Sequence, residues 1–159
     1  MKIEQAMIKS VVTLQEDVSA YEAVKLMNEN GIGCLVVLQY GQVVGIITER
    51  DMLERVLEKC KNPKETKVTE IMTKRVIVGK PSMQLDEAAK LMFENRVKKL
   101  PIVDGNHLVG LVTLTDLARI AILDKNSMEL IETRERFLQI CMNAWDTTLK
   151  KQDQSVVAR

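Results

Sequence analysis

The sequence predicts an α/β (α+β) fold of two similar units with mixed sheets, followed by a C-terminal helix. Its main support is an internal repeat. The segment Met7–Asp51 aligns without a gap on Met72–Asp116, and a third of the aligned residues are identical. Within each copy, short β-branched runs alternate with stretches of helical periodicity. Two copies packed together bury a core that a single copy of this size does not provide.

In the first copy, a strand is expected over 11–14 and a helix over about 20–30. Ser19 and Glu22 have the spacing of a capping box, which begins many helices. Gly31 stands where a glycine commonly ends a helix, because glycine adopts left-handed backbone angles without strain. The local pattern therefore places both ends of this helix.

A hairpin and a second helix complete the first copy. The apolar runs 34–38 and 43–47 flank a short polar turn, which predicts antiparallel strands. The helix that follows is expected to bury one apolar face, made of Met52, Leu53, Val56, Leu57 and Cys60.

The second copy repeats this order. Its turn, Asp104-Gly105-Asn106, is a stronger hairpin signal than the turn of the first copy. The expected elements are a strand at 76–78, a helix at about 84–95 and strands at 100–103 and 108–112.

Beyond the repeats, 128–150 contains no Gly or Pro and carries an apolar stripe that includes Trp145. The stripe fits a helix packed on its own module, or a dimerisation or partner-binding helix. We assign the first repeat to 1–60, a polar linker to 61–67, the second repeat to 68–123 and a C-terminal helical extension to 124–159.

Composition narrows the classes of function. With 23 Lys+Arg against 22 Asp+Glu and few aromatics, the chain has no broad basic field or stacking platform for nucleic acid. No apolar run is long enough to span a bilayer, and the start has no signal-peptide pattern. Three cysteines without CxxC spacing indicate reduced thiols in a cytoplasmic protein. One histidine, no metal cluster and no P-loop favour a binding protein over an enzyme.

Both copies close with the same motif, Thr48-x-x-Asp51 and Thr113-x-x-Asp116. One interpretation is structural: the hydroxyl and the carboxylate cap the helix that follows. The other is functional, since a helix N-terminus attracts phosphate and a carboxylate can accept both hydroxyls of a ribose. The two interpretations are compatible. Nearby cations are available in both copies: Arg50 in the first, and Arg96, Lys98 and Lys99 in the second.

Two copies of strand–helix–strand–strand–helix, closing with Gly45–Asp51 and Gly110–Asp116, resemble a tandem pair of CBS domains, or Bateman module. The segment Arg96–Asp104 is also typical of this family, and the resemblance covers roughly 2–120. It implies two repeats packed with pseudo-two-fold symmetry, a regulatory module without catalysis or a required cofactor, and pairing into homodimers. It also implies clefts between the repeats that bind AMP, ADP, ATP or S-adenosylmethionine, and a partner that receives the signal.

The resemblance implies roles for individual residues. Asp51 and Asp116 would hold the ribose, and Thr48 and Thr113 would assist at ribose or phosphate. Because the second copy has lysines where the first has Gly33-Cys34, we expect its cleft to suit a phosphorylated ligand better. The residues implied to line the adenine pockets are Thr13, Gly33, Cys34, Val76, Val78, Lys98, Lys99, Leu100 and Pro101.

A second hypothesis is a structural or oligomerisation module that binds no ligand. In that case both motifs serve only as caps, and the amphipathic segment 128–150 contacts a protein partner. Neither hypothesis involves a nucleic acid or a membrane.

Overall fold

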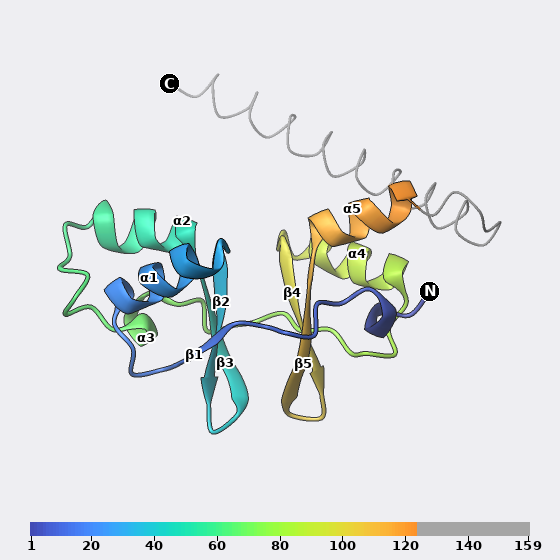
Figure 1. The fold of residues 1–159 in the computed structure, drawn as a ribbon, viewed down its shortest axis with the longest axis horizontal. Helices are drawn as coiled ribbons and strands as arrows, with labels where there is room; N and C mark the ends of the chain where they lie inside the picture. The colour runs from blue at the N-terminus through green and yellow to red at the C-terminus, as the bar shows by residue number, and fades with distance from the viewer. Residues whose placement is uncertain (124–159) are drawn as a thin grey trace, which may run out of the picture. The chain divides into compact units, whose positions relative to one another are not determined.

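The structure, a computed structural model, describes residues 1–123 (Figure 1). It divides into two compact units. The first-repeat unit comprises Lys9–Val78 and Val103–Gly110. Among the described residues, the second-repeat unit comprises Met1–Ile8, Gly79–Ile102 and Leu111–Leu123. The predicted C-terminal extension 124–159, with its stripe at 128–150, lies outside the described residues.

The first-repeat unit contains a three-stranded sheet in the order β1 (Thr13–Gln15), β2 (Cys34–Gln39), β3 (Gln42–Thr48). β1 runs parallel to β2, and β3 runs antiparallel to β2. The sheet is therefore mixed, as the hairpin pattern predicts. Because Cys34 faces Thr48 across the β2–β3 ladder, the start of β2 lies beside the end of β3.

Helix α1 (Ala20–Asn30) has the predicted ends. Ser19 Oγ accepts a hydrogen bond from the Glu22 N–H at 3.3 Å, and Glu22 Oε2 accepts one from the Ser19 N–H at 3.0 Å. Gly31 ends the helix with φ 60° and ψ 35°. The capping box and the terminal glycine are both confirmed.

The second helix of this unit differs from its prediction. It consists of α2 (Glu49–Met52) followed by a π-helical turn, η2 (Leu53–Leu57). Met52 and Val56 are buried, but Leu53 and Leu57 are 58% and 69% exposed and Cys60 is also exposed. The π-turn, marked by a 2.8 Å bond from the Glu58 N–H to the Leu53 carbonyl, holds more residues than an α-turn. Leu53 and Leu57 lie within this turn and their side chains face solvent, whereas Met52 and Val56 face the core.

A single apolar core joins the sheet to α1, α2, η2 and the short helix α3 (Val68–Ile71). The members come from every element of the unit, so the sheet and its helices share one buried layer. They are Leu14, Ala20, Ala23, Met27, Leu35, Val37, Ile47, Met52, Val56, Val68, Ile71 and Met72.

The second copy forms a two-stranded sheet of β4 (Lys99–Asp104) and β5 (His107–Thr113), with helices α4 (Leu85–Glu94) and α5 (Leu114–Leu123) (Figure 1). Both helices and the strand ends next to them belong to the second-repeat unit, whereas the turn end of the hairpin, Val103–Gly110, belongs to the first-repeat unit. A 3-10 turn, η1 (Ile3–Gln5), belongs to the second-repeat unit. The fully buried apolar side chains of this unit include Ile3, Ala88, Ala89, Met92, Leu100, Ile102, Val112 and Leu117.

The strand predicted at 76–78 is wrong. The structure has there only an isolated parallel bridge between Gly79 and Ile102, in the register that β1 and β2 have in the first copy. Gly79 has low strand propensity, and Pro101 beside it in β4 has no N–H to continue a ladder. The pairing therefore stops after one bridge.

Each unit is completed by the segment that precedes the other copy in the sequence. The Ile3 N–H bonds the Met83 carbonyl at 2.8 Å in the second-repeat unit. At the aligned position, the Val68 N–H bonds the Val18 carbonyl at 2.9 Å in the first-repeat unit. The compact units thus cut across the sequence repeats, and the boundaries 1–60, 61–67 and 68–123 stay a prediction.

Candidate functional site

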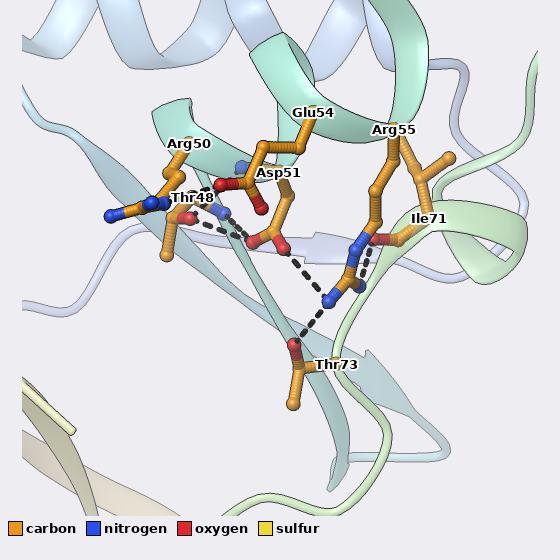
Figure 2. Close-up of polar contacts among 7 residues, drawn as sticks. All are labelled: Thr48, Arg50, Asp51, Glu54, Arg55, Ile71 and Thr73. Carbon is orange, nitrogen blue, oxygen red and sulfur yellow. Dashed lines mark hydrogen bonds and ion pairs between the residues drawn. The ribbon is translucent and has the colours of Figure 1, made fainter. Parts of the chain in front are cut away.

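The first Thr-x-x-Asp motif forms a closed capping box where β3 passes into α2 (Figure 2). Asp51 Oδ2 accepts hydrogen bonds from the Thr48 N–H at 2.8 Å and from the Thr48 hydroxyl at 2.7 Å. In return, Thr48 Oγ1 accepts a bond from the Asp51 N–H at 3.3 Å. The strand end and the first helical turn are held together by these two side chains.

An arginine engages the other oxygen of the same carboxylate. Asp51 Oδ1 lies 3.2 Å from Arg55 Nη2, and the Asp51 side chain is only 10% exposed. Arg55 also donates to the Ile71 carbonyl at 2.6 Å and to Thr73 Oγ1 at 3.4 Å (Figure 2). Arg55 therefore ties the motif to the chain that follows α3.

The cation predicted for the first motif has a different partner. Arg50 Nε donates to Glu54 Oε1 at 2.6 Å, and the Arg50 side chain is 82% exposed. This hydrogen bond raises the pKa of the Arg50 guanidinium above its ordinary value. Arg50 is thus paired at the surface, and its role as a phosphate ligand stays a prediction.

The segment at the start of β2 lies beside the first motif. The Gly33 carbonyl accepts a bond from the Glu49 N–H at 3.2 Å, and Cys34 is buried opposite Thr48. The Glu49 carboxylate lies so close to Gly33 that a Cβ there would be 2.6 Å from Glu49 Oε2. Gly33, Cys34, Thr48 and Asp51 therefore come together, with an acidic side chain against the glycine.

The second motif repeats the capping box where β5 passes into α5. Asp116 Oδ2 accepts bonds from the Thr113 N–H at 2.9 Å and the Thr113 hydroxyl at 2.7 Å. Thr113 Oγ1 accepts a bond from the Asp116 N–H at 3.2 Å. Among residues 1–123, no cation pairs with Asp116, which is only half-buried.

The segment before β4 lies beside this second motif. The Lys98 carbonyl accepts a bond from the Leu114 N–H at 3.1 Å, and the Lys98 side chain is exposed. Lys99, the first residue of β4, is half-buried, whereas Leu100 and Pro101 are buried. The segment that carries Lys98 and Lys99 thus lies beside the start of α5.

The residues predicted for the first strand of each copy, Thr13, Val76 and Val78, all belong to the first-repeat unit. Thr13 is half-buried in β1 opposite Val36, within the unit that holds the first motif. Val76 and Val78 also belong to that first-repeat unit, whereas Thr113 and Asp116 belong to the second-repeat unit. A role for Val76 and Val78 in a pocket at the second motif stays a prediction.

Sequence reasoning missed Arg55 and its acceptor Thr73. A signal was present, because the repeat alignment can be continued past Asp51. The same offset pairs Arg55 with Ile120 and Thr73 with Ile8, so both polar members are replaced by isoleucine in the other copy.

The structure adds two further findings for residues 1–123. No group of three or more His, Cys, Asp or Glu side chains is placed to hold a metal ion. No helix in this part of the chain combines the length and the apolar character that a membrane span requires.

The family profile of the CBS domain matches residues 3–58 and 68–122. The chain belongs to the CBS domain family. It is 34% identical over 116 residues to the CBS domain-containing protein YhcV of Bacillus subtilis, covering 73% of this chain and 82% of YhcV. It is 39% identical over 120 residues to inosine-5'-monophosphate dehydrogenase of Methanocaldococcus jannaschii, covering 74% of this chain but only 23% of that enzyme.

Solved structures of CBS proteins have the same fold. A putative signal-transduction protein with CBS domains from Burkholderia ambifaria is 35% identical with a TM-score of 0.74, covering 80% of this chain and 98% of that one. The CBS domain pair of protein MJ0100, in complex with 5'-methylthioadenosine and S-adenosyl-L-methionine, is 29% identical with a TM-score of 0.70, covering 76% and 94%. The chain is thus a CBS pair, a regulatory module, and the predicted fold class is confirmed.

Proposed function

We propose that this CBS pair binds an adenosine-containing ligand and passes its presence to a partner protein. The preferred ligands are AMP, ADP and ATP, with S-adenosylmethionine as the alternative. The observation that carries the proposal is the Thr-x-x-Asp capping box at the end of β3 and of β5. We place this activity in the cytoplasm, where Cys34 and Cys60, which form no disulfide within residues 1–123, would stay reduced.

The chemistry of the motif fits an adenine nucleotide. A carboxylate fixed by a threonine is a preorganised acceptor for the two hydroxyls of a ribose. In the second-repeat unit, exposed Lys98 and half-buried Lys99 offer ammonium groups for phosphate oxygens. The adenosine compounds bound to the MJ0100 pair support the nucleoside part of this proposal.

Isothermal titration calorimetry on protein stripped of bound ligand tests the proposal. AMP, ADP, ATP and S-adenosylmethionine are titrated separately, and at least one is expected to bind. Asp116→Asn is expected to weaken that binding at least tenfold, because the amide replaces an acceptor oxygen by a donor. Asp104→Asn, at an exposed hairpin carboxylate, is the matched control. Lack of binding by all four compounds at millimolar concentration contradicts the proposal.

A second candidate is a module that binds no ligand. It is favoured by one observation: each motif carboxylate already accepts two hydrogen bonds from its own threonine. Under this candidate, Asp51→Ala and Asp116→Ala each cost about 1 kcal/mol of stability, the usual value of a lost helix cap. Calorimetry would then show no nucleotide binding to lose.

We further propose that the protein forms a homodimer. Leu53 and Leu57, at 58% and 69% exposure, place two large apolar side chains on one turn of η2. Sedimentation velocity of Leu53→Glu/Leu57→Glu tests this turn as the interface, and a shift to monomer is expected. Deletion of 128–159 tests the predicted helical extension as the interface instead. Monomeric wild-type protein would contradict the dimer.

A further inference from the structure

The two motif aspartates have the same threonine partner but different surroundings. Asp51 is held from both sides, by Thr48 at Oδ2 and by Arg55 at Oδ1. Asp116 is held by Thr113 at Oδ2 alone, and no hydrogen bond or ion pair from residues 1–123 reaches its Oδ1. The two motifs have identical residues, but both oxygens of the Asp51 carboxylate have partners, whereas only Oδ2 of Asp116 has partners among residues 1–123.

This inequality follows from two aligned positions. Arg55 in the first copy corresponds to Ile120 in the second, and Thr73 corresponds to Ile8. Isoleucine can neither pair with a carboxylate nor accept from a guanidinium. The second copy therefore lacks both polar groups of the contact, which explains why Asp116 has no counterpart of Arg55.

Arg55 cannot leave Asp51 without losing other contacts. Its guanidinium also donates to the Ile71 carbonyl at 2.6 Å and to Thr73 Oγ1 at 3.4 Å, so it is held at three acceptors (Figure 2). A ribose that displaced Arg55 would have to satisfy a carboxylate that is only 10% exposed. The Arg55 side chain is itself 42% exposed, so the cost falls mainly on Asp51, a nearly buried carboxylate that would lose its compensating charge.

A second feature disfavours nucleotides at the first motif. The Glu49 carboxylate lies against Gly33 at the start of α2, beside the first motif. Glu49 is exposed, so its repulsion of a phosphate is modest and adds to the effect of Arg55. At the aligned positions the second copy has Leu114 and Lys98, one neutral and one cationic.

We propose that Arg55 closes the first motif, so that each chain binds one nucleotide, at Asp116. Asp51 then serves as a structural clamp that joins α2 to the segment after α3. Arg55 acts as a positioning residue: it determines how many nucleotides bind without contacting one. This inference rests on the proposed nucleotide-binding function.

The test counts nucleotides per chain by calorimetry, with AMP, ADP and ATP titrated separately. Wild-type protein is expected to bind one and Asp116→Asn none. Arg55→Met, which keeps an apolar stem but removes the guanidinium, is expected to bind two. Arg55→Met/Asp51→Asn is expected to return to one. Lys61→Met removes a cation with a comparable ion pair, 3.4 Å to Glu70, from the same unit and is expected to stay at one.

Circular dichroism verifies that each variant folds. If Arg55→Met does not fold, Arg55→Gln replaces it, because its amide can still donate to the Ile71 carbonyl. Two nucleotides bound to wild-type protein, or a folded Arg55 variant that still binds one, would overturn this inference while leaving the proposed function intact. No binding by wild-type protein and by every variant would overturn both.

Discussion

Gly31 and Arg96 occupy the same position of the repeat and have the same left-handed backbone, with φ of 60° and 55°. Gly31 is the C-cap of α1, and Arg96 directly follows Asn95, the C-cap of α4. Glycine takes these angles without strain, whereas a residue with a Cβ does not. The second copy therefore keeps the turn that the fold requires but fills it with a strained arginine.

Arg96→Gly is expected to stabilise the ligand-free protein by about 1 kcal/mol, because it removes the left-handed penalty. Arg96 is exposed, so the substitution loses little packing. Urea unfolding measures the effect. The reciprocal change, Gly31→Arg, adds the same penalty to the first copy and should destabilise by a similar amount. A less stable Arg96→Gly protein would contradict the strain argument.

Tyr40 should be replaceable with a gain in stability. The β2–β3 turn has φ of 50° at Tyr40 and 77° at Gly41, as in a type I′ turn, which favours Asn-Gly. Tyr40 is 93% exposed, so little packing is lost. Tyr40→Asn is expected to stabilise by about 0.5 kcal/mol or more, measured as a higher Tm.

Gly41→Ala is the matched control for this turn. A Cβ at Gly41 meets no atom within 4 Å, so its cost is conformational alone, about 1 kcal/mol. Equal melting temperatures for both variants and wild type would show that the turn does not limit stability.

Glu22 should make stability depend on acid pH. The hydrogen bonds from the Ser19 N–H and hydroxyl hold the pKa of Glu22 below its ordinary value of 4.5. A carboxyl group with a lowered folded-state pKa contributes stability above its unfolded pKa and loses it as pH falls through the folded pKa. The advantage of wild type over Glu22→Gln should therefore be full near pH 6 and shrink below about pH 4.5.

Chemical unfolding between pH 3 and 6 measures this difference. Glu65→Gln is the control. Glu65 is exposed, and its side chain forms no hydrogen bond or ion pair with any residue between 1 and 123. A wild-type advantage over Glu22→Gln that grows toward low pH would contradict the capping-box contribution.

Gly45 is expected to be intolerant of a larger side chain. A Cβ there would overlap the side chain of Met72, which is a buried member of the core. Overpacking of this kind costs about 1–3 kcal/mol, so Gly45→Ala should lower the free energy of unfolding by that amount.

Gly33→Ala is the comparison for Gly45→Ala. Its Cβ meets only the carboxylate end of exposed Glu49, which can move aside, so the cost should be about 0.5 kcal/mol or less. Equal losses at Gly33 and Gly45 would contradict the role of Met72.

The features predicted correctly from the sequence are local. The Ser19–Glu22 box, the Gly31 terminus and both Thr-x-x-Asp caps each involve residues at most a few positions apart. Their geometry follows from propensity and hydrogen-bonding capacity, which the sequence displays directly. The strand predicted at 76–78 depends on a distant partner, and it fails because its neighbour β4 contains Pro101. The predicted helix face is wrong for a local reason, because Leu53 and Leu57 lie in a π-turn that apolar spacing does not reveal.

By itself, the sequence determined the repeat, its helix ends and hairpins, and the two motifs, because each depends on contacts within a short stretch of chain. Only the tertiary structure decided that Met1–Ile8 completes the second-repeat unit and that the segment around Val68 completes the first-repeat unit. It also decided that Arg55 reaches Asp51, Ile71 and Thr73 together. Those contacts join segments 16 and 18 residues apart, and the long-range packing that brings them together is not encoded in any local pattern.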